Sequence, residues 1–166
     1  AIRAIVQFLP RAVQDGSDLE ARIRLAWAGT AAGLCESYSS CVALHAMEHA
    51  LSAFSPELPH GLGLVLLSGP FFERMACEQP ERCVRLAAAM GVDVTEVLPA
   101  RRPALFVQRL REFIRTVGLA DVQLAEYGLM PEMIPALTDN ALRTMGGLLA
   151  VTPAALDAVG VEALFR

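Results

Sequence analysis

The stretch from His45 to Gly61 reads HAMEHALSAFSPELPHG and indicates how this part of the chain folds. Its first part belongs to a helix that we expect to run from about Ser39 to Phe54. Residues 55–59, Ser-Pro-Glu-Leu-Pro, form a turn because two prolines exclude a continuous helix. A second, buried helix then begins at His60 and extends to about Cys77. The stretch therefore predicts two consecutive helices joined by a stiff turn.

The residues before this stretch also have helical periodicity. Residues 1–14 carry apolar side chains at i, i+3 and i+4 spacing, with a kink expected at a proline. Ser17–Glu20 has the pattern of a capping box. The helix that follows is expected to turn one apolar face inward, made of Leu19, Ile23, Ala26 and Trp27. We expect Gly33 to loosen or end this helix, and Gly69-Pro70 to break the helix that begins at His60.

The second half of the chain shows clearer helix ends. Pro80 stands at a first-turn position, Gly91 at a C-terminal cap, and Gly118 after a further amphipathic run. No run of alternating apolar and polar residues indicates a strand. The sequence therefore predicts an all-α bundle of about seven to nine helices in a single domain.

Composition and charge exclude two classes of partner. The chain has 166 residues, of which 54% are hydrophobic and 6% aromatic, and its mean hydropathy is +0.43. Its longest apolar run, Gly61–Phe72, is interrupted by Ser68, Gly69 and Pro70 and is shorter than the roughly 18 residues of a spanning helix. We therefore expect no membrane insertion. The net charge of −4 and the absence of a basic tract argue against nucleic acid.

The cysteines bear on the cellular compartment, and the first residue bears on whether the chain is part of a longer protein. The four cysteines lack a Cys-x-x-Cys pair and no signal peptide is visible, which favours free thiols in a reducing cytoplasm. The chain begins with Ala1 in the middle of a helical pattern. We therefore expect it to be a piece of a longer protein.

All three histidines lie between positions 45 and 60. His45 and His49 are one helical turn apart, with about 5–6 Å between their Cβ atoms. The helix carries the chain about 14 Å from His45 to Phe54, and the extended residues up to His60 can span roughly 20 Å back. The three rings can therefore meet. A lone histidine is more often an ordinary core or surface residue, but three in this arrangement favour a metal site, for which imidazole suits Fe, Zn, Ni and Cu.

A zinc peptidase is one alternative. Residues 45–49 match H-x-x-E-H, in which both histidines bind zinc and Glu48 activates water. This short pattern is weak, and it leaves Pro59-His60-Gly61 unexplained. Those peptidases also contain strands, which this sequence does not show.

A second family matches far more of the chain. Residues 33–68, GLCESYSSCVALHAMEHALSAFSPELPHGLGLVLLS, resemble the iron-containing (group III) alcohol dehydrogenases, whose signature has two histidines four residues apart followed by Pro-His-Gly. The likeness continues through residues 87–92 and 106–119 to the C-terminus. This resemblance implies a dehydroquinate synthase-like α domain over residues 1–166. In that family such a domain follows an N-terminal α/β domain that binds NAD(P), which would be missing here.

The resemblance also implies roles for single residues. His45 and His60 match the two metal ligands that this domain contributes, for Fe²⁺ or Zn²⁺. His49 matches a catalytic histidine beside the site that helps proton movement or orients the nicotinamide. Glu48 occupies a variable position and receives no role. The family's other two ligands, an Asp and a His four residues apart, would lie upstream of Ala1.

The implied function is metal-assisted hydride transfer between NAD(P) and a small-molecule alcohol or aldehyde. A metal would act as a Lewis acid on the substrate oxygen. We expect the isolated piece to be inactive and to hold metal weakly, and a homo-oligomer is compatible with the family. The alternative from another class is a helical interaction domain whose histidines are vestigial.

Overall fold

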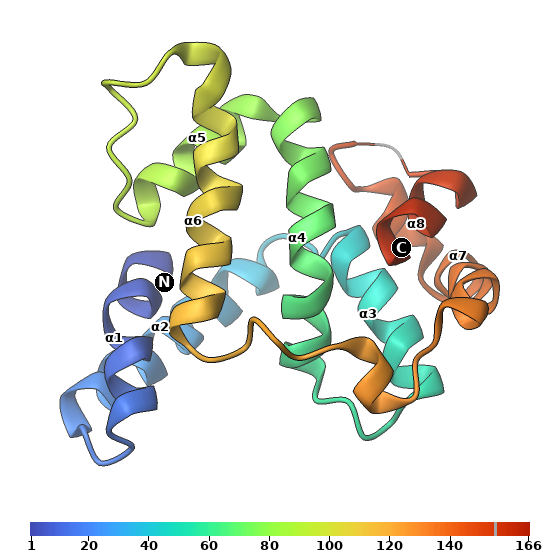
Figure 1. Ribbon diagram of the computed structural model, residues 1–166, viewed down its shortest axis with the longest axis horizontal. Coiled ribbons are helices and arrows are strands. Elements are labelled where there is room, and N and C mark those ends of the chain that lie inside the picture. The colour runs from blue at the N-terminus through green and yellow to red at the C-terminus, as the bar shows by residue number, and fades with distance from the viewer. Residues whose placement is uncertain (155) are drawn as a thin grey trace. The chain divides into compact units, whose positions relative to one another are not determined.

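The computed structural model describes residues 1–154 and 156–166 and contains eight α-helices. In chain order these are α1 (Ile2–Gln14), α2 (Leu19–Ser37), α3 (Ala43–Phe54), α4 (His60–Glu78), α5 (Pro80–Ala89), α6 (Arg102–Thr116), α7 (Ile134–Ala150) and α8 (Ala158–Phe165) (Figure 1). Three 3₁₀ turns join them: η1 (Pro99–Arg101), η2 (Leu124–Tyr127) and η3 (Pro131–Met133). No strand occurs in the described ranges. The predicted all-α class and number of helices are confirmed.

The helices form two compact units, and each unit is built from two separate stretches of chain. Unit 1 comprises residues 1–39 and 79–120, which hold α1, α2, α5 and α6. Unit 2 comprises residues 40–78 and 121–166, which hold α3, α4, α7 and α8. That residues 1–166 act as a single domain stays a prediction.

Unit 2 is organised around α3, which packs against both α4 and α7 (Figure 1). The chain can pack closely there because Ala43, Ala46 and Ala50 on α3 are small and fully buried. Met47 and Leu51 lie beside them, also with 0% exposure. Leu67 and Phe71 of α4, Leu137 of α7 and Val161 of α8 complete this apolar core. Burial of such large side chains contributes about 1.5–3 kcal/mol each, which holds α3 in place.

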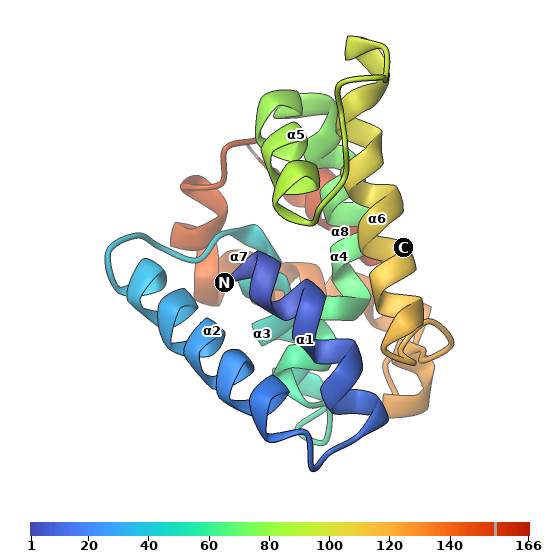
Figure 2. The ribbon, with the colours of Figure 1, turned by 90° about the vertical axis from the view of Figure 1, so that its left-hand side faces the viewer.

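Unit 1 contains two helix pairs, α1 with α2 and α5 with α6. Figure 2 shows α1 running beside α2. Phe8 of α1 is buried, and the guanidinium groups of Arg11 and Arg24 lie 5.2 and 5.8 Å from its ring centre. The α5–α6 pair buries Cys83, Phe106 and Val107.

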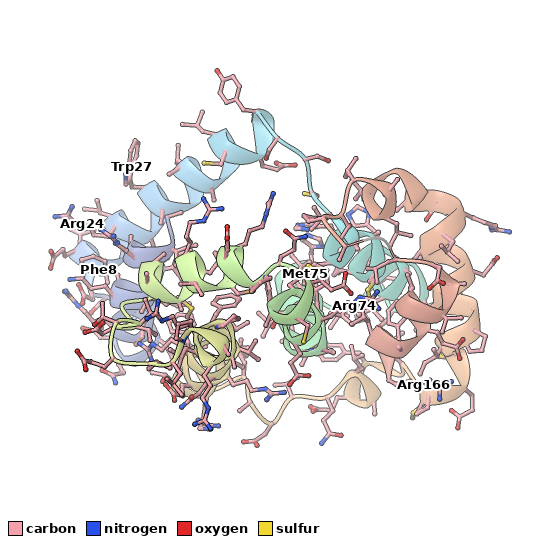
Figure 3. The ribbon with its side chains drawn as sticks, turned by 90° about the horizontal axis from the view of Figure 1, so that it is seen from above. Phe8, Arg24, Trp27, Arg74, Met75 and Arg166 are labelled. Atoms are coloured by element: carbon pink, nitrogen blue, oxygen red, sulfur yellow. The ribbon has the colours of Figure 1, made fainter. Side chains whose placement is uncertain are left out.

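The prediction that Leu19, Ile23 and Trp27 form the inward face of α2 is wrong. Leu19, Ile23 and Trp27 are 69%, 58% and 65% exposed, and Trp27 projects outward from the helix (Figure 3). The face that packs instead carries Ala21 and Ala28, both fully buried. Small residues allow the α1 and α2 backbones to approach, so the larger apolar residues lie on the other side.

Two expected features near helix ends are also wrong. The N-terminus of α2 is capped by Asp18, whose carboxylate accepts from the Ala21 N–H at 3.0 Å, so no Ser17–Glu20 capping box forms. The hydroxyl of Ser17 donates instead to Asp15 at 2.6 Å. The α2 helix continues past Gly33 to Ser37.

Helix α4 runs without interruption through Gly69-Pro70, where a break was expected. A proline inside a helix costs about 3 kcal/mol because it removes one backbone hydrogen bond. Around Pro70, however, Leu67, Phe71 and Met75 are buried in unit 2. Tertiary packing therefore outweighs the local preference.

The predicted helix ends at Gly91 and Gly118 are confirmed. Both glycines have positive φ, of 84° and 79°, the left-handed conformation that favours glycine. In each case the following residue donates its N–H back into the helix, from Val92 to Ala87 and from Leu119 to Ile114. This is the Schellman arrangement, which satisfies carbonyl groups at a helix C-terminus.

In the described part of the chain, no helix combines the length and the apolar character that crossing a membrane requires.

Candidate metal centre

The site is presented by the helical hairpin of α3 and α4 in unit 2. His45, Glu48 and His49 share one region of α3 because residues three and four apart in a helix are neighbours. His60 is the first residue of α4. Of these four side chains, Glu48 is fully buried, His45 is half-buried, and His49 and His60 are exposed. The structure thus places an open cluster of imidazoles above a buried carboxylate.

Helix α3 is held at both ends by hydrogen bonds to residues distant in sequence. At its start the Ala43 N–H donates to the Thr152 hydroxyl at 2.8 Å, and that hydroxyl donates to the Leu148 carbonyl at 2.8 Å. At its end the Ser55 hydroxyl donates to the Tyr127 carbonyl, also at 2.8 Å. The first bond satisfies a backbone N–H that the start of a helix otherwise leaves unpaired, and the last ties the end of α3 to the η2 segment. They fix the helix that carries most of the site.

The turn between the helices brings His60 back to α3. Leu58 anchors the turn in the core with only 3% exposure. Its N–H donates to the Ser55 carbonyl at 3.1 Å, and the Pro59 carbonyl accepts from the Gly63 N–H at 3.1 Å as α4 begins. Buried Leu58 and the rigid Pro59 therefore position His60 from both sides.

The three imidazole rings lie together, as the sequence predicted. The ring centres of His45 and His60 are 5.6 Å apart, with an angle of 50° between the planes. Those of His49 and His60 are 5.7 Å apart, with an angle of 82°. Because His60 is adjacent to both α3 histidines, it is the central member of the cluster.

These separations fit a shared metal ion. Imidazole nitrogens bind zinc at about 2.0–2.1 Å, and two rings on one tetrahedral ion have centres roughly 5 Å apart. Ligand atoms of Glu48, His49 and His60 also lie within 4.8 Å of one another. The donor set of imidazole nitrogens and a carboxylate suits iron or zinc.

Glu48 is the site residue whose role the sequence analysis missed. Its carboxylate bonds to Nδ1 of His60 through Oε2 and accepts from the Ser52 hydroxyl through Oε1 at 2.7 Å. The available signal was a charged residue within the otherwise apolar series Ala46, Met47, Ala50 and Leu51. A charge among such residues requires a specific partner.

The position of Glu48 does not support the zinc-peptidase alternative. A general base must reach a water molecule on the metal. Glu48 is 0% exposed and both of its oxygens are already bonded to protein groups. The H-x-x-E-H pattern therefore lacks the geometry that this reaction needs.

Comparisons with known proteins identify the family. The whole chain, residues 1–166, matches the model described as Fe-containing alcohol dehydrogenase family, C-terminal. A long-chain primary alcohol dehydrogenase of Thermoanaerobacter ethanolicus is 32% identical over 154 residues, which cover 92% of this chain and 38% of that protein. A choline dehydrogenase of Bacillus subtilis (strain 168) is 30% identical over 143 residues, covering 86% of this chain and 35% of its own length.

A solved structure agrees with these matches. The crystal structure of an alcohol dehydrogenase from an archaeal halo-thermophile of a Red Sea brine pool superimposes with a TM-score of 0.92 at 32% identity. The match covers 99% of this chain and 42% of that structure, so the chain spans about two-fifths of the relatives it resembles. On the sequence match and the shared helical fold together, the chain belongs to the Fe-containing alcohol dehydrogenase family and corresponds to the C-terminal part of its members.

Proposed function

We propose that this chain is the metal-binding part of an NAD(P)-dependent alcohol dehydrogenase. His45 and His60 would hold Fe²⁺ or Zn²⁺, with His49 beside them as a catalytic residue. The observation that carries the proposal is that the ring of His60, at the start of α4, lies close to the rings of both His45 and His49 of α3. The ring separations alone fit a pair with either α3 histidine, and the family signature selects His45.

The chain's own residues would contribute neutral metal ligands and an apolar segment that limits the access of water. When bound, the metal supplies Lewis acidity to a substrate oxygen. Neutral imidazoles bind the ion without cancelling its positive charge, whereas carboxylates would reduce it. Behind His60, the segment Leu62–Leu67 is buried or half-buried and apolar. Such a wall limits the access of water and so strengthens the electrostatic interactions in front of it.

His49 suits proton movement because it is exposed while its ring lies against His60. An imidazole can both donate and accept a proton in catalysis. A group with one side at the site and one side in solvent is suited to carry a proton between a substrate hydroxyl and bulk water.

The remaining parts of the proposal lie outside this sequence. The chain spans about two-fifths of its relatives, so the nucleotide site and the two further metal ligands would come from a preceding domain. Small-molecule alcohols or aldehydes as substrates, a cytoplasmic location and assembly into a homo-oligomer belong to the same proposal. An Asp and a His four residues apart are the expected completing ligands.

Metal retention tests the first part of the proposal. The chain should fold, bind one Fe²⁺ or Zn²⁺ ion when the metal is in excess, and lose it to a chelator, because two ligands leave a metal incompletely held. Bound metal is measured by mass spectrometry after each step. If one metal ion per chain remains bound after chelator treatment, the proposal that a preceding domain supplies the other ligands would be contradicted.

The reading frame upstream of the Ala1 codon tests the second part. We expect it to encode Asp-x-x-x-His and a glycine-rich nucleotide loop. The full product should reduce NAD⁺ or NADP⁺ with an alcohol, lose this activity to a chelator, and regain it with Fe²⁺ or Zn²⁺. A frame without these motifs would instead favour an interaction domain with vestigial histidines.

A further inference from the structure

We propose that Glu48 is a positioning residue that sets which nitrogen of His60 faces the metal. Its carboxylate bonds to Nδ1 of the ring, which assigns the proton to Nδ1 and leaves Nε2 as the metal-binding atom. The inference rests on the proposed function in one respect, namely that His60 is a ligand. The orientation of the ring is independent of that function.

Glu48 is buried, so its carboxylate requires defined hydrogen-bond partners. Among the described residues it is the one charged side chain that is buried, and its exposure is 0%. An ionised carboxylate away from water is costly unless its oxygens have partners. Here Oε1 accepts from Ser52 and Oε2 bonds to His60, so both oxygens are satisfied.

The backbone of α4 is shaped around this carboxylate at Gly63. A Cβ atom at position 63 would lie 2.9 Å from both Cγ and Oε1 of Glu48, and 3.2 Å from Leu58 Cδ2. Cβ atoms essentially never make contacts of 2.9 Å, so any larger residue at position 63 would require the Glu48 side chain to shift. By contrast, a Cβ at Gly61, two residues earlier, would have no atom within 4 Å.

The two nitrogens of an imidazole ring are not equivalent. The hydrogen bond at one nitrogen fixes the tautomer and determines which nitrogen binds a metal. Metal-binding histidines commonly donate their other N–H to a carboxylate, which fixes the ring and makes the ligand more basic. Glu48, Ser52 and Gly63 form such a support for His60, with the carboxylate held from two helices.

A direct role for Glu48 as ligand is the competing interpretation, because its oxygens lie near His49 and His60. Three variants separate the two. Glu48→Leu removes the acceptor. Glu48→Gln keeps an amide oxygen that accepts from Nδ1–H but lacks the charge. Glu57→Gln is the matched control, since Glu57 is exposed in the turn before His60.

The first measurement is the tautomer of His60 in the metal-free chain, by ¹⁵N NMR at a pH of about 8, above the usual histidine pKa of about 6.5. Wild type, Glu48→Gln and Glu57→Gln should show Nδ1–H, and Glu48→Leu should lose it. A wild-type ring protonated at Nε2, or an unchanged tautomer in Glu48→Leu, would overturn the inference.

The second measurement is Zn²⁺ affinity by competition with a chromophoric chelator. Glu48→Leu should bind about 10–100-fold more weakly, as is typical when such a support is lost. Glu48→Gln should recover most of that loss. Equal losses in both variants would show that Glu48 is a ligand. If wild type binds no Zn²⁺, the proposed function fails, while the tautomer still decides the role of Glu48.

Gly63→Ala provides a variant that keeps every polar group. It should displace Glu48 and release the His60 tautomer, and Gly61→Ala should not. Circular dichroism of both variants shows whether the helices persist. A helical Gly63→Ala variant with an unchanged Nδ1–H signal would contradict the proposed coupling between the two helices.

Discussion

At the scale of single residues, the histidine cluster has an unequal arrangement. His60 contacts both α3 histidines through its ring, and it is also the one that bonds to Glu48. His49 is exposed and its ring lies near that of His60, whereas His45 is half-buried. This asymmetry suits two metal ligands and one neighbour that exchanges protons with water.

Replacement of single histidines tests these roles. His45→Ala and His60→Ala should each weaken Zn²⁺ binding by more than about 100-fold, since loss of a ligand exceeds loss of a supporting residue. His49→Ala should retain affinity within a few-fold. Competition with a chelator measures all three, and circular dichroism checks the fold of His60→Ala, which leaves Glu48 with one partner fewer. A loss in His49→Ala as large as in His45→Ala would contradict the assignment.

Asp18 gives a second prediction, on pH dependence. The Ala21 N–H and the Arg11 guanidinium lower the pKa of the Asp18 carboxyl below its usual value of about 3.9. A pKa lowered by folding stabilises the protein above the unfolded-state pKa, and this stabilisation is lost as the pH falls through the folded-state pKa. Asp18→Asn keeps a capping acceptor but no charge. It should therefore make the decline in melting temperature below about pH 4 shallower.

Asp121→Asn is the control for this effect, because Asp121 is exposed and no hydrogen bond to it is seen in the described part of the chain. Thermal unfolding followed by circular dichroism between about pH 2 and 7 gives the comparison. Identical acid slopes in Asp18→Asn and wild type would show that the cap is not linked to folding.

At the scale of the elements, α3 depends on a cap from outside its own sequence. Its N-cap residue, Val42, has no side chain that accepts a hydrogen bond, and the hydroxyl of Thr152 takes this part. Thr152 is 6% exposed and Ala43 is 0% exposed, so water does not replace the bond. The site helix therefore relies on the segment that follows α7.

Thr152→Val tests this dependence. The change keeps the shape but leaves the buried Ala43 N–H without an acceptor, which should lower the free energy of unfolding by about 1–3 kcal/mol. The control is Thr144→Val, which removes a hydroxyl bond of 2.7 Å to the Asn140 carbonyl on the exposed face of α7. That change should stay within about 0.5 kcal/mol. The free energies are measured by urea unfolding. Equal decreases in Thr152→Val and Thr144→Val would contradict a capping role for Thr152.

Helix ends marked by glycine or proline could be predicted from sequence because the signal is local. Pro80, Gly91 and Gly118 stand where the helices begin or end. The continuation of α2 past Gly33 and of α4 through Pro70 could not be predicted, because packing determines it. The prediction of the inward face of α2 was wrong for the same reason. Large apolar residues favour burial, but the sequence does not show which element would cover them.

For the candidate site, too, some features could be predicted from the sequence and others could not. Helix rise and the reach of a short turn, which are properties of the chain alone, showed that His45 and His60 could meet. The bond between Glu48 and His60 depends on how closely α4 approaches α3 at Gly63. No spacing rule in the sequence specifies that distance.

At the scale of the whole molecule, all four site residues belong to unit 2, which combines residues 40–78 with 121–166. The second of these stretches contributes no site side chain but holds α3 through Thr152 and Tyr127. The site therefore depends on contacts between residues 72 and 109 positions apart. Family membership extends over the whole chain, whereas the candidate site residues of this chain lie in one helical hairpin.

The central claim is that His45 and His60 jointly hold one metal ion. Crystals of the chain grown with excess Zn²⁺, measured at the zinc absorption edge, test it most directly through the anomalous difference map. The account predicts a single peak about 2.0–2.1 Å from Nε2 of His60 and from a ring nitrogen of His45, with Glu48 bonded to His60 and not to the ion. A peak on Glu48, or no zinc between these two rings, would contradict it.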